Sequence, residues 1–236
     1  MIKAVLFDLD GTLLPMDQDL FIKTYFSYLA KKLAPYGYES KKLIGAVLAG
    51  TDSMIKNDGN CTNEEAFWQT FCKIFGENAK NDLPYFDEFY SVDFAKIRAV
   101  CGYTPKAKEC VYHLKEQNIQ VVLATNPIFP AVATKQRIQW AGLEPNDFEL
   151  FTTYENSRFC KPNLKYYQDI ISHLGLKAEE CVMVGNDVSD DMVTAKMGMK
   201  VFLLTDCLIN KDNVDISAYP NGNFDDLITY LKTVNE

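Results

Sequence analysis

The sequence predicts an α/β protein in which a doubly wound parallel sheet carries an inserted all-helical domain. Four short apolar runs without polar alternation are typical of strands that are buried on both faces. Helical patterns lie between the later runs, which favours parallel strands joined by helical crossovers. A long stretch rich in aromatic residues separates the first run from the second, and it is too long for a simple crossover.

The strands and helices of the core follow one another in a regular order. Strands are expected at residues 2–7, 121–124, 181–184 and 201–204. Helical patterns cover residues 105–117, 130–141, 164–174 and 190–197. A last amphipathic helix is expected over residues 225–231, with Asn223 as the candidate N-cap.

The inserted segment has the composition of a helical domain with its own core. Residues 16–100 hold half of the chain's Phe, Tyr and Trp residues. Apolar residues recur at helical spacing over residues 21–33, 43–48 and 67–75, and Thr62 and Glu65 form a capping-box pattern ahead of the third set. We therefore expect a helical domain over residues 16–99 and a discontinuous core over residues 1–15 and 100–236.

Composition and charge restrict the class of protein. The formal net charge of −8 has the wrong sign for a protein that binds nucleic acid. The seven cysteines show no Cys-x-x-Cys spacing, which indicates reduced thiols rather than disulfides or a zinc site. Asp8 ends the N-terminal apolar run before it reaches the length of a signal peptide, and no run reaches the roughly 18 apolar residues of a membrane span. We expect a cytoplasmic protein without a membrane partner.

Acidic residues follow the first predicted strand directly. Asp8 and Asp10 are two residues apart, so in an extended chain they point to the same side, and Gly11 permits a sharp turn after them. Thr125 and Asp187 also come after apolar runs. Because ligands bind at the carboxyl ends of strands in open parallel sheets, we expect these side chains to converge.

The segment over residues 8–14 resembles the first motif of the haloacid dehalogenase superfamily of phosphotransferases. The family's other motifs are matched in order: an apolar strand that ends in Thr125, then Lys161 followed by Pro162, then residues 182–191. The resemblance covers residues 1–14 and about 100–205. It implies a Rossmann-like core with a helical cap inserted between the first two motifs.

The resemblance also implies roles for the acidic residues. Asp8 would attack the phosphorus, and Asp10 would act as general acid and then as general base. Mg²⁺ would be held by the Asp8 carboxylate, the Asp10 backbone carbonyl and the Asp187 carboxylate, with Asp191 in an outer position. Oxygen donors without His or Cys favour Mg²⁺ over zinc. Asp190 lies beside Asp191, so the identity of the second acid in the fourth motif stays open.

Three further residues are expected at the phosphate. Thr125 and the Asn126 backbone N–H would donate hydrogen bonds to phosphate oxygens, and Lys161 would supply a balancing positive charge.

The predicted function is that of a Mg²⁺-dependent phosphatase, which hydrolyses a small phosphorylated metabolite through an aspartyl phosphate. A phosphomutase would share the core, and a phosphonate hydrolase would need a Schiff-base lysine from the cap, for which Lys56 is a candidate. A dehalogenase would lack Asp10, and a non-catalytic binding protein would not need the intact motifs. Residues 49–62 are expected to form a polar cap loop that faces the site and includes Asp52, Ser53 and Lys56.

Overall fold

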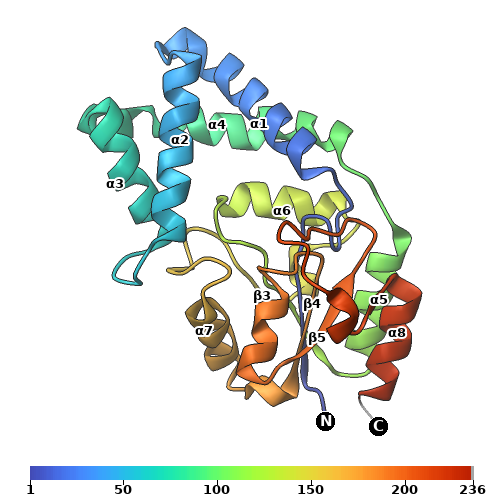
Figure 1. Ribbon diagram of the computed structural model, residues 1–236. Helices are drawn as coiled ribbons and strands as arrows, with labels where there is room; N and C mark the ends of the chain where they lie inside the picture. The colour runs from blue at the N-terminus through green and yellow to red at the C-terminus, as the bar shows by residue number, and fades with distance from the viewer. Residues whose placement is uncertain (235–236) are drawn as a thin grey trace.

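The computed structural model describes residues 1–234 as a six-stranded sheet with helices on both faces and a helical segment above one end (Figure 1). The strand order is β3-β2-β1-β4-β5-β6, and every neighbouring pair is parallel. The strands are β1 (Ala4–Phe7), β2 (Gln120–Leu123), β3 (Leu150–Phe151), β4 (Cys181–Gly185), β5 (Lys200–Leu204) and β6 (Asn221–Gly222). The predicted α/β class and parallel sheet are confirmed.

The central strands are apolar throughout because both faces of the sheet are covered. Val5 and Phe7 of β1 belong to one hydrophobic cluster, whereas Ala4 and Leu6 belong to the other. Buried apolar residues of α5 (Pro105–Glu116), α6 (Ala131–Trp140) and α8 (Phe224–Thr233) lie in the first cluster. Those of α7 (Leu164–Leu174) lie in the second. Asn223 caps α8, as its sequence position predicts.

The regular elements between β1 and α5 are all helical. They are α1 (Gln18–Leu33), α2 (Ser40–Ile55), α3 (Asn63–Phe75) and α4 (Leu83–Glu88), with 3-10 turns at Ala34–Tyr36 and Glu77–Asp82. A π-helical turn (Phe89–Asp93) and a 3-10 segment (Phe94–Val100) lead back to the core. In Figure 1 this helical segment, residues 18–100, lies over the end of the sheet opposite the two chain termini.

Aromatic packing holds the helical segment together and joins it to the core. Phe71 of α3 is fully buried and contacts Trp68 and Phe86 edge to face. The capping box predicted for Thr62 and Glu65 is present at the start of α3. The hydrophobic cluster that covers one face of the sheet continues into this segment without a break.

Two expectations from the sequence need correction. Residues 190–197 do not form an α-helix; only Met192–Met197 are helical, as a 3-10 segment, and Asp190 precedes it in a turn. Residues 49–62 are not one loop, because α2 continues to Ile55. Gly50 lies inside α2, and its missing side chain leaves room for the Phe67 ring, because a Cβ there would lie 2.5 Å from Phe67 Cδ2.

No helix within residues 1–234 combines the length and the apolar character that a membrane crossing requires.

Candidate active site

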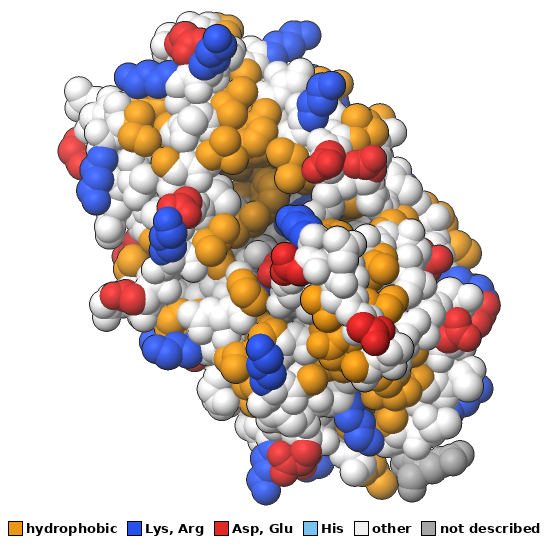
Figure 2. Space-filling view, in the orientation of Figure 1, with side chains coloured by type: hydrophobic (Ala, Val, Ile, Leu, Met, Phe, Trp, Pro, Cys, Tyr) orange, Lys and Arg blue, Asp and Glu red, His pale blue; other side chains and the backbone are white. Residues whose placement is uncertain are grey.

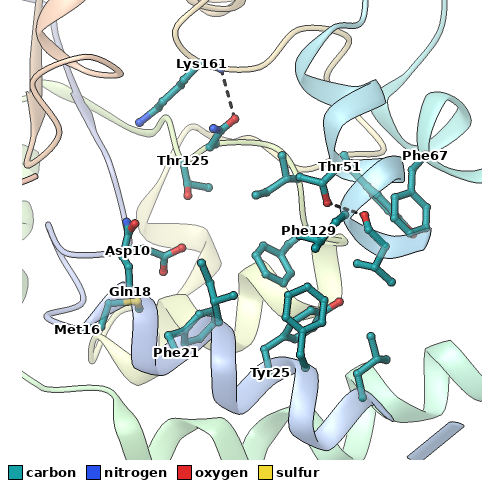
Figure 3. A pocket seen from close by; sticks show the side chains of 18 of the residues that line it. Asp10, Met16, Gln18, Phe21, Tyr25, Thr51, Phe67, Thr125, Phe129 and Lys161 are labelled. Atoms are coloured by element: carbon teal, nitrogen blue, oxygen red, sulfur yellow. Dashed lines mark hydrogen bonds between the residues drawn. The ribbon is translucent and has the colours of Figure 1, made fainter. Parts of the chain in front are cut away.

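Side chains from three strand ends and the following loops border one cavity of about 280 Å³ between the sheet and the helical segment (Figure 3). Asp8 follows β1 and extends its ladder, with its N–H donating to the Val184 carbonyl at 2.9 Å. The cavity is lined by all seven residues that the sequence singled out: Asp8, Asp10, Thr125, Asn126, Lys161, Asp187 and Asp191. The topology therefore brings together residues that lie up to 183 positions apart, because parallel strands end at the same edge.

Lys161 joins two of the acidic residues. Its ammonium donates to Asp8 Oδ1 at 2.7 Å and to Asp191 Oδ1 at 2.6 Å. Its side chain is 1% exposed, so these are buried, charge-assisted hydrogen bonds. Burial lowers the pKa of Lys161, but Asp191 and Asp8 raise it by more, so that the pKa lies well above its usual value. Lys161 therefore carries its positive charge at the ends of β1 and β4.

Asp191, rather than Asp190, enters this network. Asp191 is buried, and its Oδ2 accepts a hydrogen bond from the Asp187 N–H at 3.0 Å. Burial raises the pKa of Asp191, against the opposing effect of Lys161. Asp190 lines the same cavity. Its backbone carbonyl accepts a hydrogen bond from the Tyr167 hydroxyl of α7 at 2.6 Å, but its carboxylate does not bond to Lys161.

Asp10 is paired with a residue that the sequence reasoning missed. Arg137 of α6 donates to Asp10 Oδ2, and its guanidinium lies 4.5 Å from the centroid of the Phe129 ring. Arg137 is 1% exposed although it is an arginine. The sequence did hold one indication that Arg137 is buried. It lies four residues after Ala133 and one before Ile138, both of which are buried residues of α6. Burial raises the pKa of Asp10, and Arg137 acts in the opposite direction.

A tight turn places Asp8 and Asp10 against the loop after β4. Gly11 has a φ of +86°, and a Cβ on it would lie 2.3 Å from Asn186 Nδ2. The Thr12 hydroxyl donates to Asn186 Oδ1 at 2.9 Å and lies 3.4 Å from Asp8 Oδ2. Glycine is needed here for its backbone conformation and for the close approach of the two loops.

Thr125 is positioned through its backbone. Its carbonyl accepts hydrogen bonds from Thr152 Oγ1 at 2.7 Å and from the Tyr166 hydroxyl at 2.8 Å. Its own hydroxyl has no protein partner within residues 1–234, so it is free to donate into the cavity. The neighbouring Asn126 accepts the Lys161 backbone N–H at 3.3 Å, which holds the second and third motifs together.

The donor set suits a magnesium ion better than a softer metal. No three His, Cys, Asp or Glu side chains of residues 1–234 stand close enough to hold a metal by themselves. Mg²⁺ needs only one or two carboxylates, because waters and substrate phosphates complete its coordination. Asp8 and Asp187 border the same cavity, so two carboxylates are present at one place. Repulsion among the carboxylates is offset in part by Lys161 and Arg137.

Fold and site together define an α/β protein with an acidic, lysine-containing centre at the carboxyl edge of its sheet. Residues 2–198 match the model of the haloacid dehalogenase-like hydrolases, and the chain belongs to this family. The expected family and enzyme class are thus confirmed.

Curated relatives of the chain are phosphatases. A glyceraldehyde 3-phosphate phosphatase of Methanothermobacter thermautotrophicus is 24% identical, over 99% of this chain and all of the relative. A ribulose-1,5-bisphosphate 5-phosphatase of Halopiger xanaduensis is 26% identical, over 86% of this chain and 84% of its own.

Solved structures share the fold. A 2-haloacid dehalogenase of Pseudomonas syringae superposes with a TM-score of 0.66 at 18% identity, and 99% of each chain is covered. A predicted phosphatase of Clostridium acetobutylicum superposes with a TM-score of 0.61 at 19% identity, over 99% of this chain and all of the other. These structures span different chemistries, so the residues of the site must decide the reaction.

Proposed function

We propose that the protein is a Mg²⁺-dependent phosphatase of small phosphate monoesters and that it works through an aspartyl phosphate on Asp8. The observation that carries the proposal is the position of Asp8, Asp10 and Lys161 on one cavity, where Lys161 holds one oxygen of the Asp8 carboxylate. Asp10 also argues against the dehalogenase alternative.

In the first step, an Asp8 carboxylate oxygen forms a bond to phosphorus as the bond between phosphorus and the ester oxygen breaks. Asp10 donates its proton to the leaving oxygen, which departs as the alcohol. In the second step, water attacks the phosphorus and gives its proton to Asp10, and Asp8 is released as a carboxylate. Burial of Asp10 supports its part as an acid, because it raises the pKa of the carboxyl.

The cationic and hydroxyl donors then serve the phosphate. Lys161 balances the negative charge of the transferred group, and its link to Asp191 keeps the ammonium at the cavity. Thr125 has a free hydroxyl for a phosphate oxygen, and Asn126 adds its backbone N–H. These donors are anchored by buried contacts before substrate binds, which reduces the reorganisation needed in the transition state.

Mg²⁺ would be held by the carboxylates of Asp8 and Asp187 and by the Asp10 backbone carbonyl, with Asp191 outside the first ligands. When bound, it would offset the repulsion between the Asp8 carboxylate and the phosphate. Asp187 is oriented for this by the N–H groups of Ser189 and Asp190, which donate to its Oδ1 at 2.8 and 3.0 Å.

Residues 16–99 are proposed to act as a cap domain on a core of residues 1–15 and 100–236, which closes over the substrate and excludes water. The Schiff-base lysine of a phosphonate hydrolase lacks support, because no lysine of residues 16–99 lines the cavity. Lys56 is exposed and pairs with Asp52 at 2.7 Å. The seven cysteines are all free thiols, which fits the proposed cytoplasmic location.

A screen of phosphorylated metabolites with Mg²⁺ tests the proposal, with kcat/KM measured by phosphate release. The screen should include glyceraldehyde 3-phosphate and ribulose 1,5-bisphosphate, the substrates in the names of the relatives. The control is the Asp8→Asn variant. Release no faster than in this variant, for every ester, would reject the proposal, and transfer of the phosphoryl group without release would favour a mutase.

A further inference from the structure

The part of the cavity that faces away from the catalytic residues is apolar and aromatic. Figure 2 shows the hollow lined by hydrophobic side chains, with charged groups at its edge. Seven aromatic residues of the helical segment border this part of the cavity: Phe21, Tyr25, Phe26, Phe67, Trp68, Phe86 and Tyr90. No Lys, Arg or His of residues 18–100 borders the cavity. Apart from Asp87, the charged residues that border the cavity come from the core and not from the helical segment.

Some of the polar groups in this wall are paired within the protein, whereas Gln18, Asp87 and the indole N–H of Trp68 also border the cavity. The hydroxyls of Tyr25 and Tyr90 bond to each other at 2.8 Å, and Thr51 Oγ1 donates to the Val47 carbonyl at 3.0 Å. A leaving group with several hydroxyls would meet mainly apolar side chains here and would give up more hydrogen bonds to water than the scattered polar groups could replace. Unmet hydrogen bonds in a buried site are unfavourable, so the wall selects against sugars.

Part of this apolar wall is exposed rather than packed in the protein's own core. Leu48 of α2 and Ile22 of α1 line the cavity, yet they are 53% and 46% exposed. An apolar ligand in the cavity would cover such surface and gain the free energy of removing it from water.

The rings at the boundary with the catalytic residues already pack edge to face. The centroid of the Phe129 ring lies 6.2 Å from that of Phe21 and 5.4 Å from that of Tyr25, with angles of 74° and 81° between the ring planes. The guanidinium of Arg137 lies over the same Phe129 ring. Figure 3 shows these rings on the side of the cavity away from Lys161. A flat ring entering beside them would meet both ring edges and ring faces.

We infer that the substrate is a phosphate monoester whose leaving group carries an aromatic ring. This inference rests on the proposed phosphatase function and narrows its substrate class. The phosphate would lie at Asp8 and Lys161, and the ring would lie among Phe21, Tyr25 and Phe129.

Benzyl phosphate and glycerol 3-phosphate test the inference, because both release a primary alcohol and differ mainly in the apolar ring. We expect kcat/KM to be roughly 10- to 100-fold higher for benzyl phosphate, as burial of a phenyl group implies. Equal or higher kcat/KM for glycerol 3-phosphate would overturn the inference and leave the phosphatase function intact.

Two matched variants locate the selectivity. Leu48→Asn should lower the ratio of kcat/KM for benzyl over glycerol phosphate by roughly three- to tenfold. Ile55→Asn is the control, because Ile55 lies on the same helix, is 45% exposed and does not line the cavity. It should leave the ratio unchanged. A Leu48→Asn ratio equal to that of the wild type would show that the apolar wall serves only the fold.

Binding to the Asp8→Asn protein separates the two proposals. Calorimetry on this variant, which lacks the proposed nucleophile, should show tighter binding of benzyl phosphate than of glycerol 3-phosphate and a negative heat-capacity change. If the wild-type protein hydrolyses neither ester, nor p-nitrophenyl phosphate, the phosphatase function is rejected, and this binding preference still decides the cavity inference.

Discussion

Asp10 and Arg137 form an ion pair although they are 127 residues apart in the sequence. Arg137 reaches the site from α6, is almost fully buried, and rests on the face of Phe129. The pair places a fixed positive charge beside the proposed general acid and base. It therefore links the protonation of Asp10 to a residue outside the four sequence motifs.

Replacing Arg137 with Met should shift the pH dependence of kcat. Arg137 lowers the pKa of Asp10, so its removal lets that pKa rise further. Asp10 must be a carboxylate to accept the proton of water, so the acidic limb of the kcat profile should move to higher pH. Arg137→Lys keeps a charge and should shift the limb less. An unchanged profile in a folded Arg137→Met protein would remove Arg137 from this role.

Asp10→Asn keeps the backbone carbonyl and the size of the side chain, but it can neither give nor take a proton. We expect kcat on an alkyl phosphate to fall by roughly 10² to 10⁴-fold. With p-nitrophenyl phosphate, the aspartyl phosphate should accumulate, because its hydrolysis still lacks a base; rapid-quench labelling measures it. Asp8→Asn should abolish turnover more completely. Wild-type rates for Asp10→Asn would refute the assignment.

Lys161→Ala should weaken both catalysis and the fold. Loss of its charge should reduce kcat/KM by roughly 10² to 10³-fold. It also leaves Asp8 and Asp191 as buried acids without their partner, which should lower the free energy of unfolding by about 3 kcal/mol in urea titration. Lys165→Ala is the control, since Lys165 is exposed and does not line the cavity. An unaltered kcat/KM would mean that another cation serves the phosphate.

Removal of divalent metal by EDTA should abolish phosphate release and leave the fold in place. The buried strands do not involve the proposed ligands, so circular dichroism should be unchanged. Added Mg²⁺ should restore the activity. Full activity in excess chelator would overturn the metal assignment.

Gly185→Ala, at the end of β4, should reduce the activity by displacing Asp191. The new Cβ would lie 2.0 Å from Asp191 Oδ2, so Asp191 must move and release Lys161. We expect a loss of kcat/KM together with a lower melting temperature. Gly45→Ala is the matched control, because Gly45 lies exposed in α2 with open space around it, and it should stabilise by about 0.5–1 kcal/mol. Equal activity in both variants would show that Asp191 is not required.

Much of the architecture could be predicted from local patterns. Unbroken apolar runs predicted β1, β2, β4 and β5 to within a few residues, and helical periodicity predicted α1, α2, α3 and α7. Strands β3 and β6 were missed because each has only two residues, too few for a pattern. The turn at Asp190 and Asp191 was assigned to a helix because Asp is also frequent at helix starts.

The motif order and the strand ends were enough to predict which residues gather at the site. All seven candidate residues line the cavity, and this follows from the parallel sheet. The choice between Asp190 and Asp191 required the position of Lys161, because the two residues are neighbours in a turn and only one carboxylate reaches the ammonium. Lys56 was a candidate because of its sequence position alone, and it points to solvent.

By itself, the sequence determined the parallel core, the helical insertion and the acidic strand ends, since each of these depends on local periodicity and residue type. Only the tertiary structure decided the partner of Asp10 and the apolar character of the cavity wall. Arg137 meets Asp10 from α6, and the wall combines Phe129 from the core with Phe21 and Tyr25 from α1. Contacts of this kind depend on how elements far apart in the sequence pack against each other. A periodic pattern within one segment does not show which distant segment it will contact.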